Sequence, residues 1–298
     1  MSGNRGSVLA GVLGSGALAL LYSIAVEPYR VQTVYAEISL PRLPNAFDGY
    51  TILHLSDLHT RRYGRRERLI RKLIEQLPEP DLAVITGDLV HTMAGIPNFF
   101  RTVEGLTARD GIYAIYGNSE HKNGVRPGAF ARELEAKGIH PLLNKNVTIE
   151  HDGSTIGLVG VDDPVSLKDD MRAAVEGLDD SLFKLLLMHT PDGISEAVVR
   201  GIDLTLSGHT HGGQVKLPIV GALFTHSLLG RRMSHGYYAG KRLYQIIGIR
   251  AGRSQFDKNW FQQHIRRHGV SRTGAKHQWN GHRTRESISR RKLIKKQF

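Results

Sequence analysis

The stretch TILHLSDLH at residues 51–59 runs from a short aliphatic strand pattern directly into two polar residues, Asp57 and His59. Further strand-like runs of the same kind follow at residues 82–86, 112–116, 156–161, 183–188 and 203–206. Between the first two runs, residues 67–77 carry apolar side chains at helical spacing. Apolar strands that alternate with amphipathic helices predict an α/β domain with a largely buried sheet.

The strand-like runs end in polar residues that could hold a ligand. In open α/β sheets, ligands gather beyond the carboxyl ends of the strands, so we expect these residues to converge. Residues two apart in an extended segment project to the same side, so a pair with this spacing is able to grip one cation. Glycines precede several of them and permit tight turns. The polar residues are Asp57 with His59, Asp88 after Gly87, Asn118 after Gly117, His189, and His209 with His211 after Gly208.

The order Asp-x-His, Gly-Asp, Gly-Asn, His and Gly-His-x-His resembles the signature of the calcineurin-like metallophosphoesterases. The resemblance extends over about residues 48–249. The segments at residues 54–59, 189–192 and 207–214 are similar to the membrane-attached bacterial branch of that family. The resemblance implies a four-layer α/β-β/α sandwich built from two mixed sheets.

The same resemblance implies the roles of the polar residues. Three of them would hold one metal ion and three the other, while Asp88 would bridge the two ions. A mixture of oxygen and imidazole ligands suits Mn, Fe or Zn. Two such divalent metal ions can ionise a bridging water near neutral pH and clamp both oxygens of a phosphoryl displacement. We therefore expect a dinuclear-metal-dependent phosphohydrolase that cleaves a phosphodiester or a pyrophosphate bond. The first set is Asp57, His59 and His211, and the second is Asn118, His189 and His209.

The sequence departs from the family pattern at residues 117–121, which read GNSEH. Where the family has a histidine that assists the transition state, this chain has Ser119, which is a poor proton donor. General acid help of this kind is worth roughly 100- to 10,000-fold. His121 lies two residues further on, and we predict it as the catalytic residue that takes the vacant place. The alternative is an ordinary surface histidine.

The N-terminal segment reads as a membrane anchor. Residues 6–26 are uncharged, and at about 1.5 Å per residue they span roughly the 30 Å of a bilayer core. We expect an anchor at residues 1–27, a single-pass protein of the cell membrane with the side of the catalytic domain left open, and a linker at residues 28–47. The alternative is a signal peptide cleaved near Ala25. An anchor makes a lipid-linked substrate one of the alternatives to consider.

The charge of the chain is concentrated at its C-terminal end. The net charge is +12, but residues 250–298 hold 14 of the 40 basic residues and only two acids. The remainder is balanced, so nucleic acid is not an expected partner of the phosphoesterase domain at residues 48–249. The tail has few aliphatic residues, which predicts a poorly ordered extension. The alternative is an arm that contacts anionic lipid or nucleic acid.

A second function fits the same sequence. The chain would be a weakly active or inactive metal-binding module that is tethered to the membrane and uses its basic tail for contacts. Ser119 favours this interpretation because it removes the expected transition-state histidine. The absence of cysteine excludes a disulfide framework and a thiol nucleophile in either case.

Overall fold

The computed structural model describes residues 33–211 and, outside that range, residues 14, 21–22, 25, 29, 31, 216–217, 221–222, 227, 236–239, 243–247 and 260–266. The chain divides into two compact units, Met1–Arg267 and His268–Phe298. All of the described residues belong to the first unit.

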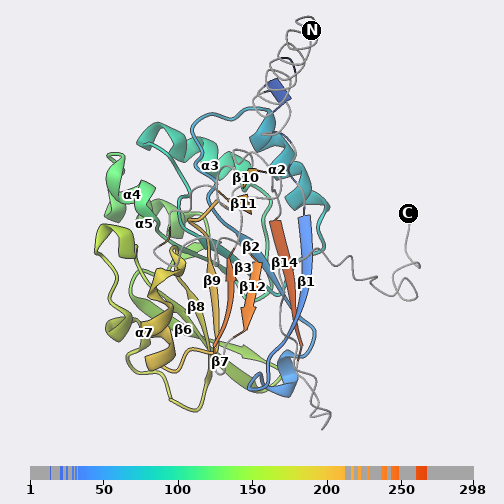
Figure 1. The fold of residues 1–298 in the computed structure, drawn as a ribbon, viewed down its shortest axis with the longest axis vertical. Coiled ribbons are helices and arrows are strands. Elements are labelled where there is room, and N and C mark those ends of the chain that lie inside the picture. The colour runs from blue at the N-terminus through green and yellow to red at the C-terminus, as the bar shows by residue number, and fades with distance from the viewer. Residues whose placement is uncertain are drawn as a thin grey trace, which may run out of the picture. The chain divides into compact units, whose positions relative to one another are not determined.

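Two six-stranded mixed sheets form the centre of this unit (Figure 1). The first sheet has the order β1-β14-β2-β3-β4-β5, and the second has the order β12-β13-β9-β8-β7-β6. The strands of the first sheet are β1 (Thr33–Ser39), β14 (Trp260–Arg266), β2 (Tyr50–Leu55), β3 (Leu82–Thr86), β4 (Ile112–Ile115) and β5 (Ile139–Pro141). Those of the second are β12 (Gly236–Ala239), β13 (Tyr244–Ile247), β9 (Leu204–Ser207), β8 (Phe183–Leu187), β7 (Ser154–Gly160) and β6 (Lys145–His151). Strands β10 (Lys216–Leu217) and β11 (Gly221–Ala222) pair separately.

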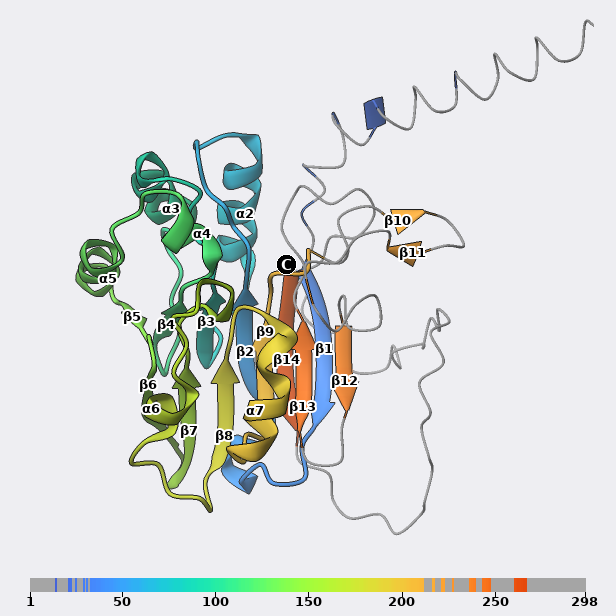
Figure 2. The same ribbon diagram turned by 60° about the vertical axis from the view of Figure 1, so that its left-hand side comes forward.

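Helices cover the outer faces of both sheets (Figure 2). Helices α2, α3 and α5 pack on the first sheet, and α6 and α7 pack on the second. The sequence-based prediction of an α/β fold with two sheets is therefore confirmed. The helices are α2 (Arg65–Gln76), α3 (Ile96–Thr102), α4 (Asn118–Lys122), α5 (Pro127–Ala136), α6 (Met171–Val175) and α7 (Ile194–Val199), with short 3-10 turns at Asn45–Phe47, Met93–Gly95, Pro164–Ser166 and Pro191–Gly193.

The strands are apolar on both faces because each face is buried. In β3, Leu82 and Val84 pack between the two sheets, while Ala83 and Ile85 pack beneath the helices. Successive side chains of a strand point to opposite faces, so a strand covered on both sides reads as a continuous apolar run. This explains why the runs in the sequence lacked a polar alternation.

Two strands lie where the sequence predicted no regular structure. Strand β1 falls within the expected linker at residues 28–47, and β14 falls within the basic tail expected to be poorly ordered from residue 250 onward. Strand β14 pairs in parallel with β1 and antiparallel with β2. The first sheet therefore incorporates segments from both ends of the chain. Pro28, Pro41 and Pro44 near β1 and the basic composition of the tail argued against strands at these places.

The expected membrane anchor falls largely outside the described residues. Within residues 6–26, only residues 14, 21, 22 and 25 are described. Among the described residues, no helix has the length and apolar character needed to cross a bilayer.

Candidate metal centre

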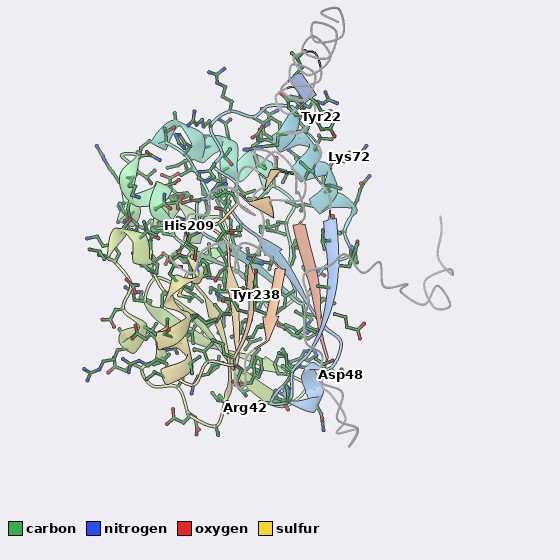
Figure 3. All side chains as sticks on the ribbon, in the orientation of Figure 1. Tyr22, Arg42, Asp48, Lys72, His209 and Tyr238 are labelled. Carbon is green, nitrogen blue, oxygen red and sulfur yellow. The ribbon has the colours of Figure 1, made fainter. Side chains whose placement is uncertain are left out.

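The predicted site residues follow the carboxyl ends of strands from both sheets. Strands β2, β3 and β4 of the first sheet and β8 and β9 of the second carry them. Main-chain hydrogen bonds tie these loops together: Asp57 N–H donates to the Gly87 carbonyl at 3.1 Å, and Gly208 N–H donates to the His189 carbonyl at 2.9 Å. His209, labelled in Figure 3, lies toward the end of the unit that carries α3 and α4.

The backbone is held in the left-handed region at five of these residues. Non-glycine residues rarely adopt a positive φ, and each costs of order 1–3 kcal/mol unless the surroundings impose it. Such strain is typical of functional sites. The residues and their φ angles are Asp57 (54°), His59 (42°), Asp88 (52°), His209 (66°) and His211 (51°).

Two of the glycines in the motifs permit close approach. A Cβ atom on Gly208 would collide with the Ser56 hydroxyl and the Asp57 carboxylate. A Cβ atom on Gly117 would collide with the Asp88 carboxylate and, at 2.7 Å, with Nε2 of His189. Neither glycine has a positive φ, so the backbone conformation does not require glycine at these positions. Glycine is required because the backbone passes close to the site residues. The sequence-based interpretation had instead assigned these glycines to tight turns.

Four of the predicted ligands form one compact cluster. Asp57, His59, Asp88 and His211 each offer one ligand atom, and these atoms all lie within 4.8 Å of one another. Nε2 of His59 lies 3.1 Å from Oδ2 of Asp88, and Nε2 of His211 lies 3.4 Å from Oδ1 of Asp57. This is the set that the sequence assigned to the first ion together with the bridging aspartate.

His189 also lies close to Asp88, and His209 lies next to His189. Nε2 of His189 is 3.5 Å from Oδ2 of Asp88 and 3.2 Å from Nδ1 of His209. Nδ1 of His189 lies 2.7 Å from the Thr86 carbonyl, which can only accept, so Nδ1 carries a proton and donates it. Hydrogen bonds of this kind orient a histidine ligand so that its other nitrogen faces the metal.

Each aspartate has one oxygen held by the protein. Oδ2 of Asp57 accepts the Ser56 hydroxyl at 2.7 Å and the His209 N–H at 3.0 Å. Oδ1 of Asp88 accepts the Ser119 N–H at 2.8 Å. The other oxygen of each carboxylate is the one that lies close to the histidines. These bonds fix the two carboxylates so that their remaining oxygens face the cluster.

The site concentrates negative charge. Burial raises the pKa of Asp57 and Asp88, but neighbouring histidines outweigh it and hold the pKa of Asp57 below, and that of Asp88 well below, the usual value. Burial lowers the pKa of His189, yet Asp88 and Asp57 raise it to about 10. Burial and the neighbouring His189 lower the pKa of His209 to about 4. Without a cation, His189 thus carries the compensating proton, which a metal ion would replace.

The residues present fit divalent cations. Oδ1 of Asn118 is a buried atom without a hydrogen-bond partner among the described residues. Leaving a buried polar atom unpaired is costly, and a cation beside it would satisfy it. Carboxylate, amide and imidazole donors together form an ordinary ligand set for a transition metal. The position of Asn118 at the start of α4 brings it next to Ser119, whose N–H binds Asp88.

Ser119 and Glu120 have roles that the sequence did not reveal. The Ser119 hydroxyl lies 3.1 Å from Nδ1 of His59, so it orients this predicted ligand. The buried Glu120 carboxylate accepts the N–H groups of Asp88, Val90 and Gly117 at 2.9–3.0 Å. Burial and the nearby Asp88 raise the pKa of Glu120 to about 8. The spacing of Glu120 three residues after Gly117, typical of a capping box, could have indicated this contact.

His121, the predicted catalytic residue, pairs with a carboxylate. Its Nε2 atom lies 2.7 Å from Oδ1 of Asp162, in the loop after β7. Both side chains are nearly buried, and the imidazole meets the Tyr116 ring edge-on. The structure thus orients His121 through Asp162, a partner that the sequence analysis did not assign to it.

Buried carboxylates and imidazoles meet at the carboxyl ends of strands from both sheets, as the resemblance to the metallophosphoesterases implied. The chain belongs to the calcineurin-like phosphoesterase family, whose sequence model matches residues 50–213. It is 33% identical over 248 residues to the uncharacterized metallophosphoesterase YkuE of Bacillus subtilis (strain 168), covering 80% of this chain and 84% of that protein.

Two further proteins are similar to this chain, one over less of its length and one at lower sequence identity. A transmembrane protein with metallophosphoesterase domain from Bos taurus is 32% identical over 209 residues, which cover 64% of this chain and 46% of that protein. Among solved structures, the phosphopantetheinyl hydrolase PptH from Mycobacterium tuberculosis is 11% identical with a TM-score of 0.46, covering 74% of this chain and 96% of that one.

Proposed function

We propose that this protein is a phosphohydrolase that uses two divalent cations to cleave a phosphodiester or pyrophosphate bond. The observation that carries the proposal is the position of Asp88, whose Oδ2 atom lies 3.1 Å from Nε2 of His59 and 3.5 Å from Nε2 of His189. One carboxylate oxygen close to imidazoles of both predicted ligand sets suits a shared ligand of two cations. Bound there, divalent cations would lower the pKa of a coordinated water and neutralise charge on phosphoryl oxygens.

The chain itself would supply charge and orientation. Asp57 and Asp88 remain ionised, and the Thr86 carbonyl and the Ser119 hydroxyl fix the imidazoles of His189 and His59. Preorganised groups need no rearrangement during the reaction, which is a large part of electrostatic catalysis. The strained backbone at the ligands supports the same interpretation.

Metal analysis and hydrolysis of bis(p-nitrophenyl) phosphate by the full-length protein test the proposal. We expect two equivalents of Mn, Fe or Zn, loss of activity with a chelator, and loss of at least about 100-fold in kcat for Asp88→Asn. Asp203→Asn is the matched control, because Asp203 is a buried carboxylate at the opposite end of β9. A protein that binds no divalent metal, or an Asp88→Asn variant with unchanged kcat, would exclude this function.

For His121 we propose proton donation to the leaving oxygen. Asp162 binds Nε2 and leaves Nδ1 as the atom that would transfer the proton. The loss of a general acid slows substrates with poor leaving groups most. His121→Ala should therefore slow an alkyl phosphodiester by about 100-fold or more and a p-nitrophenyl ester far less. If both substrates slow equally, or if Ser119→His gains nothing while His121→Ala loses nothing, this role is refuted.

We also propose that residues 6–26 anchor the protein in the cell membrane, where the site would be within reach of a lipid-linked substrate. The anchor is supported by the length of this segment and its lack of charged residues. It is also supported by the bovine relative, which is described as a transmembrane protein. Extraction of membranes with carbonate and with detergent tests it: the full-length protein should require detergent. Release by carbonate would contradict the anchor without affecting the proposed chemistry.

A further inference from the structure

Arg61 lies at the edge of the metal centre on a fixed loop. The loop leads from β2 to α2, and Thr60 within it is fully buried. Thr60 N–H donates to the Leu89 carbonyl at 3.1 Å, and its own carbonyl accepts the His91 N–H at 3.0 Å. The carbonyl of Arg61 accepts the Asn98 side-chain amide at 3.0 Å. The backbone that carries Arg61 is therefore tied to two neighbouring segments.

One imidazole ring separates the guanidinium of Arg61 from a predicted metal ligand. The guanidinium donates a hydrogen bond to Nε2 of His91. The His91 ring centroid lies 6.1 Å from that of His59. This row of side chains runs outward from the metal centre and ends in a positive charge that is exposed to solvent.

Within the described part of the chain, the charge of Arg61 has no counter-ion. Nearby arginines on α2 are paired: Arg66 with Glu67 at 2.6 Å, and Arg71 with Glu75 at 2.8 Å. Among residues 33–211, no carboxylate lies within ion-pair distance of Arg61. Exposed Arg62 and Arg65 in the same stretch add to the positive charge. Guanidinium groups are well suited to bidentate binding of phosphate or carboxylate.

We propose that Arg61 binds a second anionic group of the substrate, separated by several atoms from the phosphorus that is attacked. The intervening His91 ring sets this separation, because it keeps the guanidinium from reaching a group adjoining the reacting phosphoryl. Arg61 is thus a specificity-determining residue that selects doubly charged substrates. The inference rests on the proposed function, since it presumes that a phosphoryl group occupies the metal centre.

Calorimetry on the manganese-loaded, full-length protein tests the inference with two probes that differ by one phosphate. Thymidine 3′,5′-bisphosphate carries a second phosphate across the sugar, and thymidine 5′-phosphate lacks it. A hydrogen-bonded charge pair is worth about 10- to 100-fold in affinity, so the wild type should bind the bisphosphate more tightly by that factor. Arg61→Gln should reduce this ratio to near one, and Arg61→Lys should restore part of it.

Arg132→Gln is the matched control, because Arg132 is an exposed arginine on α5 and its loss changes the net charge equally. This variant should keep the wild-type ratio. A wild type that binds both probes equally, or an Arg61→Gln variant with the wild-type ratio, would overturn the inference.

Hydrolysis of thymidine 5′-(p-nitrophenyl phosphate) separates this outcome from a failure of the proposed function. If the ester is cleaved and Arg61→Gln leaves the binding ratio unchanged, only the role of Arg61 is refuted. If the ester is not cleaved but Arg61 determines the binding ratio, the anion site is supported and the hydrolase function fails.

Discussion

Replacing Ser119 with alanine tests whether its hydroxyl orients a metal ligand. The hydroxyl lies 3.1 Å from Nδ1 of His59, and the Ser119 side chain is buried with 3% of its surface exposed. Without it, Nδ1 loses its partner and the imidazole is free to turn Nε2 away from Asp88. Partners of metal-binding histidines are typically worth 10- to 100-fold in metal affinity. This factor corresponds to about 1.4–2.7 kcal/mol.

The assay is competition for Mn²⁺ against a fluorescent chelator, with the thermal unfolding of the metal-free protein measured in parallel. We expect the dissociation constant of Ser119→Ala to rise about 10- to 100-fold. Ser207→Ala is a demanding control, because Ser207 is a buried serine close to the site whose hydroxyl has no hydrogen-bond partner among the described residues. It should leave the metal affinity within about twofold.

Two results would refute this reasoning. The first is a Ser119→Ala variant that binds Mn²⁺ as tightly as the wild type. The second is an equal loss of affinity in Ser207→Ala, which would assign the effect to general repacking near the site. A weaker affinity in Ser119→Ala alone, with the metal-free protein unfolding at nearly the same temperature, would establish the positioning role.

Three further predictions follow from the same contacts. Burial lowers the pKa of His54 to about 4, so His54 in the unfolded chain takes up a proton at a higher pH than in the folded protein. About 3 kcal/mol of folding stability, fully present above pH 6.5, should therefore be lost as the pH falls toward 4. In urea unfolding, His54→Phe should show a weaker dependence of stability on pH. Gly208→Ala should weaken Mn²⁺ binding at least about tenfold because the new methyl group collides with Ser56 at the site, and unchanged affinity would contradict it. A chain ending at Ile249 lacks β14, which pairs with β1 over seven positions and with β2 over five, so it should elute as aggregates on gel filtration, whereas a chain ending at Arg267 should not.

The centre of the fold could be predicted because burial on both faces leaves a clear record in the sequence. The predicted run at residues 82–86 has the same bounds as β3, and the predicted run at residues 183–188 is one residue longer than β8. Strand β14 could not be predicted in this way, since its residues WFQQHIR lack an aliphatic run and lie within a strongly basic segment. Its place in the sheet depends on main-chain pairing with β1 and β2, and pairing between distant segments leaves little trace in composition.

The candidate site was predictable as a set of residue types but not as a network. The aspartates and histidines that follow strand-like runs, several of them after a glycine, indicated which side chains would converge at the carboxyl ends of the strands. The partners that hold them come from contacts across the fold: the Thr86 carbonyl on His189, 103 residues apart, and the Ser119 hydroxyl on His59, 60 residues apart. No local spacing encodes such pairs. The substitution at Ser119 therefore read as a loss in the sequence, whereas the structure gives this residue a contact of its own.

The backbone strain at the site has a physical explanation. Five predicted ligand positions with positive φ oppose folding, since each strained residue alone costs of order 1–3 kcal/mol. The ligands come from strands of both sheets, so cations bound there would join the two halves of the sandwich. A cation present at 100 times its dissociation constant stabilises the folded state by about 2.7 kcal/mol. If cations bind as proposed, the strained backbone holds their ligands in place before the metal arrives, and metal binding would offset part of its cost.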